Sequence, residues 1–526
     1  MSPRTEAALT GHAIRSFLRN PVAAFFTLAF PVTFLIIVAS LVGDVRTGSG
    51  VPVAQFLVAP FAVFGVAQAS FVLVAVDMAG LRENGVLLRL RATPVPAWAV
   101  LAARIGASVV ASGMAVALLV TVGILGYDVR IVWHKLPAML VTLLLGIACC
   151  AALGLALAAL TRTVLVAQSL AQGLLITLAF VSDVFIVGAV LPRWLDVLGS
   201  VLPLKHFARA MAETFDPAPG SGFSPGHLTV LALWTVAGAV VASLRFGWQP
   251  RGAGTPRVPV DPDSPAAARL SPPTVSHRSP LAGQIAYALL GLRRNGLAVF
   301  FSLVFPALLL ALFPTVFGGG QVHGMPMAQY LFAGMIAYSA TVTAYVDMPE
   351  SVVVARAAGV LKRLRGTPLP FRWYLAGRAG AALFAALLAA ALLTAVGVGF
   401  LDVRLDATRL PALLLTIAAG VLCFAALGLA VAALLASARS IVAVTLGTLL
   451  PLCFVSEVFV VGDQPLPGRL TAVANVFPLR HLLQAVLAAT DPAATGTGLA
   501  PGHLAVLAGW TALGLLIATR RRAALD

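Results

Sequence analysis

The chain has 526 residues, of which 60% are hydrophobic and only 10% are charged, and its mean hydropathy is +0.98. A soluble domain carries about 25% charged residues, so the composition excludes a soluble enzyme and indicates a polytopic membrane protein. The formal net charge of +16 would favour a nucleic-acid partner in a soluble chain. Here the basic residues cluster at the ends of apolar runs, as cytoplasmic anchors do, so we expect a lipid bilayer and no nucleic acid as partner.

Apolar runs of spanning length predict six transmembrane helices in the first half of the chain. A basic segment at 1–20 precedes them, and we expect it to form a short helix in the inner membrane interface. A proline-containing segment at 192–225 is expected to hold one or two short helices on the outer side. The predicted spans cover residues 22–42, 55–78, 98–125, 136–160, 164–191 and 227–246.

The second half of the chain repeats the first. VSDVFIVG at 181–188 returns as VSEVFVVG at 455–462, and VLPLKH at 201–206 returns as VFPLRH at 476–481. A tandem duplication therefore predicts two domains, 1–246 and 281–526, joined by a proline-rich cytoplasmic linker at 247–280. The expected fold is an all-α polytopic membrane protein with 12 transmembrane helices in two parallel six-helix repeats. The distribution of Lys and Arg predicts that both chain ends are cytoplasmic.

One basic segment is repeated with unusual fidelity. RENGVLLRLRATPVP at 82–96 returns as RAAGVLKRLRGTPLP at 356–370, each time between the second and third spans. Arginines cannot enter lipid without a cost of several kcal/mol each, whereas the interleaved leucines favour an apolar contact. We therefore expect a short basic helix that docks into a groove on a cytoplasmic partner and moves the two attached spans. A plain positive-inside anchor is the alternative, which explains the arginines but not the repeated Gly-Val-Leu and Thr-Pro-x-Pro.

The sequence shows no nucleotide-binding or catalytic motif. It contains no G-x-x-x-x-G-K-[ST] motif, no H-E-x-x-H motif and no nucleophilic triad. We therefore expect no catalytic residue, no metal site and no cofactor in this chain, and energy that comes from a partner protein or an ion gradient. Cys149, Cys150, Cys423 and Cys453 lie within apolar runs, and we expect them to be buried small side chains.

The basic segment, Phe-Pro in the first span of each half and the proline-broken segment before the sixth span resemble the permeases of ABC exporters, in the ABC type-2 membrane family. The resemblance implies two fused permeases of a bacterial cell membrane, each docking on one of two copies of a separate ATP-binding-cassette ATPase, which would hold ATP and magnesium. It implies export of a drug, an antibiotic or a lipid-like compound by alternating access. The docking residues that it implies are Arg82, Glu83, Gly85, Arg89, Arg91, Thr93 and Pro94 in the first half, and Arg356, Gly359, Lys362, Arg363, Arg365, Thr367 and Pro368 in the second.

Candidate residues for the substrate path lie within or near the spans. Asp183 and Glu457 occupy equivalent positions near the outer end of the fifth span, and an ionisable group inside a span is a functional candidate. They would meet a cationic substrate or gate the exit. Alternatively, they would only bond the adjacent Ser182 and Ser456, or would already lie at the interface where water reaches them. Phe30 and Phe305 stand before the prolines of the first spans and are expected on the path, at the seam between the halves.

Two further features have simpler interpretations. Asp77 and Asp347 are expected at solvated inner helix ends, with the Asp-Met pair four residues farther from the basic segment in the second half. His206 and His481, next to Lys205 and Arg480, are expected to have structural roles on the outer side.

Two other functions fit part of the sequence. A proton-coupled secondary transporter of the major-facilitator kind also has six plus six parallel spans and a cytoplasmic linker, but Thr-Pro-x-Pro is foreign to its loop between the second and third spans. A membrane-embedded enzyme of lipid or glycan chemistry would need a catalytic constellation, and the sequence shows none. A gene for a lone ATPase beside this one would favour the export permease over both.

Overall fold

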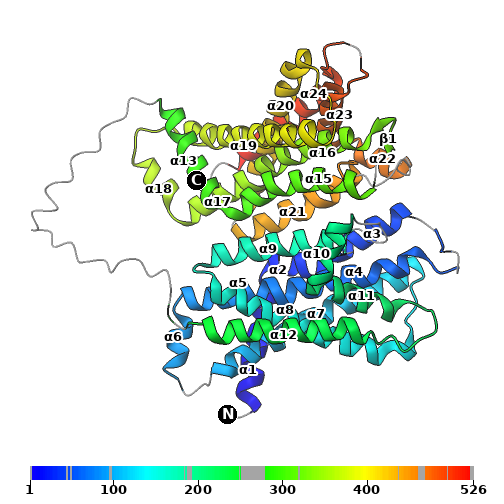
Figure 1. Cartoon of the computed structure of the whole chain (residues 1–526). Helices are drawn as coiled ribbons and strands as arrows, with labels where there is room; N and C mark the ends of the chain where they lie inside the picture. Colours follow the sequence, from blue (N-terminus) through cyan, green and yellow to red (C-terminus); the bar gives the residue numbers. More distant parts are fainter. Residues whose placement is uncertain are drawn as a thin grey trace, which may run out of the picture.

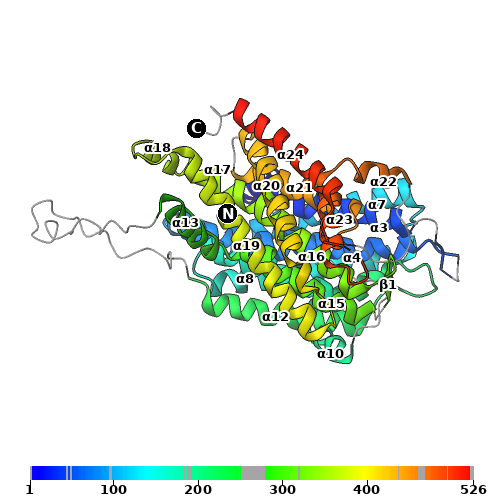
Figure 2. The ribbon, with the colours of Figure 1, turned by 90° about the horizontal axis from the view of Figure 1, so that it is seen from above.

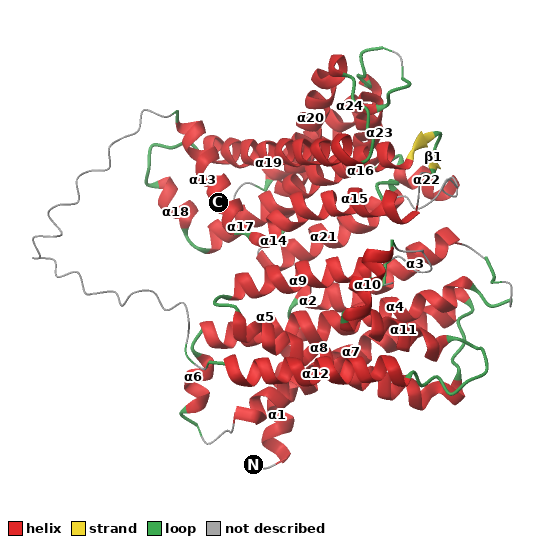
Figure 3. Cartoon of the chain, in the orientation of Figure 1, coloured by secondary structure: helices red, strands yellow, loops and turns green. Residues whose placement is uncertain are grey.

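The computed structural model describes residues 3–42, 45–47, 50–93, 97–182, 184–185, 192–247, 249, 279–317, 320–435, 438–459, 468–494 and 496–521. Helices dominate this part of the chain, and the strands β1 (Gln321–Val322) and β2 (Met325–Pro326) pair as a short antiparallel hairpin (Figure 3). The expected all-α polytopic class is therefore confirmed. Pro94 and Asp183 lie outside the described residues.

The first half begins with the helix that the sequence predicts before the first span. Asn20 then accepts a hydrogen bond from the backbone N–H of Ala23 (3.3 Å), and Pro21 occupies the first helical turn, which together begin the first span. The helices of this half are α1 (Pro3–Leu18), α2 (Pro21–Ala24), η1 (Phe25–Ala29), α3 (Phe30–Val42), α4 (Val53–Ala67), η2 (Gln68–Val72), α5 (Leu73–Glu83), α6 (Val86–Arg91), α7 (Ala97–Tyr127), η3 (Trp133–Lys135), α8 (Leu136–Leu160), α9 (Val164–Val181), α10 (Arg193–Val201), α11 (Pro203–Phe215) and α12 (Pro225–Arg245).

The second half repeats this order. Asn295 caps the start of its first span as Asn20 does, accepting from the backbone N–H of Ala298 at 3.3 Å. Its helices are α13 (Pro280–Arg294), α14 (Gly296–Val299), η5 (Phe300–Val304), α15 (Phe305–Phe317), α16 (Met327–Val342), η6 (Thr343–Asp347), α17 (Met348–Ala357), α18 (Val360–Arg365), α19 (Phe371–Phe400), η7 (Ala407–Arg409), α20 (Leu410–Leu434), α21 (Ala438–Val455), α22 (Gly468–Ala474), α23 (Pro478–Thr490) and α24 (Pro501–Arg520).

The structure supports the predicted spans, with one correction. Within the described residues, 11 helices are long and apolar enough to cross a membrane, and α21 is a shorter apolar helix in the place of the twelfth. The fifth span was expected to reach residue 191, but α9 ends at Val181 and Ser182 follows in a non-helical conformation. The fifth span is therefore shorter than its apolar run.

The two halves lie side by side and share one orientation. In Figure 1 the first half fills the lower part of the view and the second half the upper part, with α9 and α21 between them. The basic helices α6 and α18 lie at the same end of the molecule, together with α1 and α13. Figure 2 shows β1 and α22 at the opposite end from α13 and α18. This arrangement is that of a parallel repeat.

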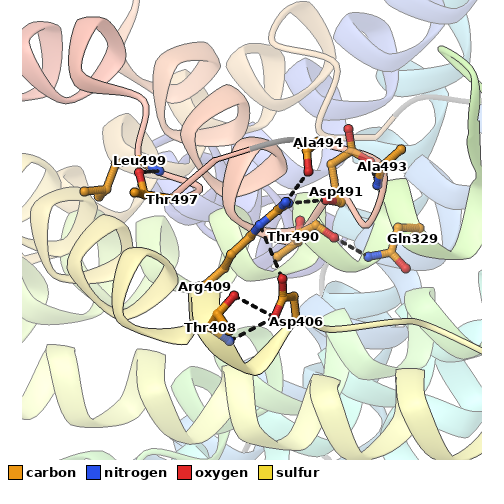
Figure 4. A network of polar contacts seen from close by, with 10 residues as sticks. All are labelled: Gln329, Asp406, Thr408, Arg409, Thr490, Asp491, Ala493, Ala494, Thr497 and Leu499. Carbon is orange, nitrogen blue, oxygen red and sulfur yellow. Dashed lines mark hydrogen bonds and ion pairs between the residues drawn. The ribbon is translucent and has the colours of Figure 1, made fainter.

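At the end opposite the basic helices, a buried cation braces each half. In the second half, the Arg409 guanidinium donates to the carbonyl oxygens of Asp491 (2.6 Å) and Ala494, and the Gln329 amide donates to the carbonyl of Thr490 at 2.6 Å (Figure 4). In the first half, Lys135 Nζ donates to the Asp216 carbonyl at 2.8 Å. These bonds fix the end of α11 or α23 over the start of the fourth span.

The four cysteines are free and buried. This agrees with the prediction that they are small interior side chains.

Candidate functional site

The structure divides the repeated basic segment into two helices. Arg82 and Glu83 complete α5, and the basic helix α6 begins only at Val86. Gly85 between them has φ +67°, and Gly359 at the same place in the second half has φ +71°. A side chain at such a φ is strained, so the repeated glycine is what breaks the helix. The basic helix is thus shorter than the segment 82–94 that the resemblance implied.

Each basic helix has one buried and one exposed face. Leu87 in α6 and Leu361 in α18 are buried and pack against the membrane body. The other side presents a mixed basic and apolar surface, as the sequence predicts. Its exposed residues are Leu88, Arg89, Arg91 and Thr93 in the first half, and Lys362, Arg363, Arg365, Thr367 and Pro368 in the second.

Arg82 is not part of this exposed surface. Its side chain is fully buried, and the guanidinium donates to the carbonyl oxygens of Ala158 (2.7 Å) and Thr161 (2.6 Å). These carbonyls belong to the last turn of α8 and the residue after it, where a helix leaves acceptors without partners. The expected docking role of Arg82 is therefore wrong, and the residue instead fixes α5 to the end of the fourth span.

Glu83 makes the next connection along the chain. Its carboxylate accepts a hydrogen bond of 2.6 Å from the backbone N–H of Val164, the first residue of α9. An anion at a helix N-terminus is favoured by the free N–H groups and the helix dipole. Arg82 and Glu83 together tie the root of α6 to the turn between the fourth and fifth spans.

The second half makes a different connection at the equivalent position. Arg356 donates to the carbonyl of Leu435 at 3.4 Å, a longer bond than either bond of Arg82, and its side chain is only partly buried. Ala357 stands where the first half has Glu83 and offers no carboxylate to α21. The two basic helices are therefore attached differently to the spans behind them.

The fifth spans form the contact between the halves. The first span of each half packs against the fifth span of the other, α14 against α9 and both α2 and α3 against α21. A Cβ added at Gly173 of α9 would lie 3.4 Å from the Phe300 ring, and one added at Gly447 of α21 would lie 3.2 Å from the Phe25 ring. At each of these positions, the missing side chain of glycine leaves room for a phenylalanine ring of the opposite half. Sequence reasoning missed both glycines, although their equivalent positions in the two halves were a signal.

Phenylalanine rings fill this contact, which we call the seam. Phe34 and Phe454 meet across it edge to face, with ring centroids 4.7 Å apart, and Phe180 lies 6.1 Å from Phe305. Phe30 packs against Phe34 in the same cluster, at 5.2 Å. The structure therefore places the candidate path residues Phe30 and Phe305 in the seam, in apolar surroundings.

The first and second spans of each half also contain a π-helical turn. These turns are η1, η2, η5 and η6, and they occupy nearly equivalent positions in the two halves. A π-turn locally disturbs helix packing and often occurs at functional positions. Here η1 and η5 carry Phe25 and Phe300, the two rings that face the seam glycines.

The expectation for Asp77 and Asp347 was wrong. Asp77 lies inside α5, six residues before its end, and its carboxylate accepts from Arg104 of α7 at 3.0 Å. Asp347 lies in η6 within the second span of the other half. Arg82 and Arg356 are 274 positions apart, and the same offset places Ser351, not Asp347, at the position equivalent to Asp77. Asp77 and Asp347 are therefore not equivalent, and the second half has no insertion between its acid and its basic segment. Arg378, opposite Arg104, instead lies over the rings of Tyr287 and Tyr374.

Glu457 lies in a turn beyond the end of α21 and has a left-handed backbone, with φ +62°. Its side chain is 8% exposed, and one carboxylate oxygen lies 2.9 Å from Arg480 while the other lies 3.6 Å from His323. The bond to the adjacent serine that we considered is not formed, because the Ser456 hydroxyl has no hydrogen-bond partner among the described residues. Glu457 is therefore an ion-pair residue in the turn after α21 rather than an acid within that helix.

The outer histidines are paired with each other. His206 and His227 approach to 2.8 Å between their Nδ1 atoms, and His481 and His503 approach to 2.9 Å. Each pair joins the helix before the sixth span to the start of that span. In His206 and His481, the Nε2 atom also contacts a backbone carbonyl. These contacts agree with the structural role expected from the sequence.

Comparison with known families gives one match. The family described as ABC-2 type transporter matches residues 7–215 and again residues 285–490, which is most of each half. Among curated proteins, no sequence matches this chain.

Proposed function

Since the chain belongs to the ABC-2 type transporter family and is thus the membrane component of an ABC transporter, we propose that it exports an amphipathic or hydrophobic compound with energy from a separate ATP-binding-cassette ATPase. Two copies of that ATPase would dock on α6 and α18 and would hold ATP and magnesium. The chain itself would hydrolyse nothing. The rival secondary transporter draws no support from the family match.

The observation that carries this proposal is the connection from each basic helix to the seam. The surface with Arg89 and Arg91 is exposed at one end of the molecule, and its root is tied through Arg82 and Glu83 to the turn before α9. The fifth span α9 then packs against the first span of the other half. A partner that displaces α6 therefore displaces a helix of the seam, and such contiguous contacts can transmit a conformational change.

The composition of the seam supports the proposed class of substrate. Its rings come from both halves, because Phe34 of the first half meets Phe454 of the second and Phe180 of the first half meets Phe305 of the second. An apolar path disfavours a charged sugar chain, because charge costs several kcal/mol in such surroundings. A hydrophobic or amphipathic compound avoids that cost. The outward direction of transport follows from the family resemblance and is part of the proposal.

The experiment that tests the proposal is the ATPase rate of the chain co-purified with its candidate ATPase. Arg89→Glu combined with Arg363→Glu reverses one exposed charge on each basic helix, and Arg520→Glu reverses an exposed arginine at the end of α24 as a control. We expect the double variant to lose the partner or to lose most of its coupled activity, and the control to retain both. A double variant that couples normally, or transport that follows a proton gradient with no ATPase bound, would overturn the proposal.

A further inference from the structure

The second half contains a pocket at the end of the molecule that bears β1, β2 and α22. Its volume is about 530 Å³, within the range of small-molecule sites. The hairpin, the turn after α21, and the helices α22, α23 and α24 contribute its walls. This pocket is distant from the basic helices, which lie at the opposite end (Figure 2).

The duplication explains why space exists at this place. Where the first half has Arg209 and Glu213 on α11, the second half has Gln484 and Ala488 on α23, and both of these line the pocket. Two further wall positions also differ, because Thr471 replaces the carboxylate Asp196 and Ala500 replaces the hydroxyl residue Ser224.

In the first half these polar side chains form a network of ion pairs and hydrogen bonds. Asp196 pairs with Lys205 and lies 3.7 Å from Arg209, and the Ser224 hydroxyl donates to the Glu213 carboxylate. Removal of this polar network in the second half leaves the volume unfilled. The wall of this pocket therefore differs between the halves in the side chains named above.

The loss of the network also redirects the remaining charges. Arg480 is the counterpart of Lys205, but with Thr471 in place of Asp196 it pairs with Glu457 instead, at 2.9 Å. The Glu457 carboxylate is more than nine-tenths buried and lines the pocket. Arg480 lies 2.9 Å from its Oε2 atom, and His323 Nε2, which is charged only when protonated, lies 3.6 Å from Oε1.

We propose that this pocket binds a small organic cation whose protonated amine occupies the space beside Glu457 Oε1. A buried carboxylate that lines a pocket favours a cationic hydrogen-bond donor. The Tyr330 side chain and Met325 offer an aromatic and an apolar wall for the carbon skeleton, and the Gln484 amide offers a donor and an acceptor. Binding at this site needs neither the ATPase nor the transport activity proposed above.

The test is binding of benzylamine to the purified full-length chain in lipid nanodiscs, with benzyl alcohol as the uncharged analogue. We expect benzylamine to bind at least about tenfold more tightly than benzyl alcohol, and Glu457→Gln to remove that preference. Gln484→Arg restores the residue of the first half, fills the pocket with a like charge and should abolish binding. Arg209→Gln in the first half is the matched control and should leave benzylamine binding unchanged.

If Glu457→Gln fails to fold, Gln484→Arg still tests the proposed binding site. This variant should fold, because the equivalent helix of the first half, α11, carries an arginine at this position. The proposal is overturned when benzylamine and benzyl alcohol bind equally, when neither binds to the wild-type chain, or when folded Gln484→Arg binds benzylamine as the wild type does. A negative result in these binding experiments would not affect the proposal that an ATPase drives the chain. A negative result in the ATPase experiment would likewise not affect the proposal for this pocket.

Discussion

The carboxylate of Glu83 accepts a 2.6 Å hydrogen bond from the backbone N–H of Val164. This bond joins the last residue of α5 to the first residue of α9, across 81 positions of sequence. It therefore connects the root of a basic helix directly with a span that lines the seam. Ala357 occupies the same position in the second half. The two halves of one chain therefore allow a basic helix with this bond to be compared with one that lacks it.

Glu83→Ala should weaken coupling through α6 with little loss of stability, because water can replace the carboxylate at this exposed position. A residue on such a connection changes coupling by about 0.5–2 kcal/mol, so we expect transport per ATP hydrolysed to fall about twofold to thirtyfold. Ala357→Glu should raise coupling through α18. The measurement is the ratio of transport to ATP hydrolysis in proteoliposomes.

Asn84→Ala is the control for Glu83→Ala. The Asn84 amide donates to the carbonyl of Gly80 within its own helix, at 2.9 Å, and does not bond α9. A ratio that falls equally in both variants would show that any change near the turn disturbs coupling, and the specific role of the Glu83 bond would be lost.

Arg82→Ala should destabilise the protein more than Arg356→Ala. Removal of Arg82 leaves two buried carbonyl acceptors without their short bonds from the guanidinium, at about 1–3 kcal/mol for each unsatisfied group. Arg356 is less buried, and its bond to Leu435 is 3.4 Å long. Thermal unfolding of the two purified variants gives the comparison, and equal losses would contradict the structural difference between the halves.

The sequence predicted the repeated spans and the exposed arginines, because hydropathy and charge are local properties of the chain. It could not predict the burial of Arg82, since the carbonyls that bind it lie 76 and 79 positions away. The end of α9 at Val181 was also not predicted, because the sequence after Val164 remains apolar beyond that residue. The pocket was not predicted. Its signal in the sequence is that Gln484 and Ala488 stand where the first half has Arg209 and Glu213.

Bulk at the seam glycines should force the halves apart. A Cβ at Gly447 already lies 3.2 Å from the Phe25 ring, and one at Gly173 lies 3.4 Å from the Phe300 ring, so leucine at either position overpacks the seam. We expect Gly173→Leu and Gly447→Leu each to cost about 1–3 kcal/mol and to slow transport. Thermal unfolding and transport assays measure the two effects.

Gly113→Leu is the control for the seam variants, because a Cβ at Gly113 of α7 has no atom within 4 Å. It should unfold and transport much as the wild type does. Seam variants that match this control would show that the halves do not depend on close contact between the fifth spans and the opposite first spans.

Acidification should remove the contribution of Asp196 to the stability of the outer end. Lys205 is buried, and its hydrogen bond to the Asp196 carboxylate lowers the pKa of that group below its ordinary value. A carboxyl with a pKa lowered by folding stabilises the folded state above its unfolded pKa of about 3.9, and this contribution disappears as the pH falls through the folded value.

Asp196→Asn should therefore be less stable than the wild type at pH 7. The difference should begin to shrink as the pH falls below about 3.9 and should vanish only below the lowered pKa of the folded state. The measurement is the midpoint of thermal unfolding for both proteins across this pH range. Asp402→Asn, at an exposed carboxylate of the second half, is the control for general effects of acid. A difference between wild type and Asp196→Asn that persists unchanged at low pH would show that the ionised carboxylate is not what holds Lys205.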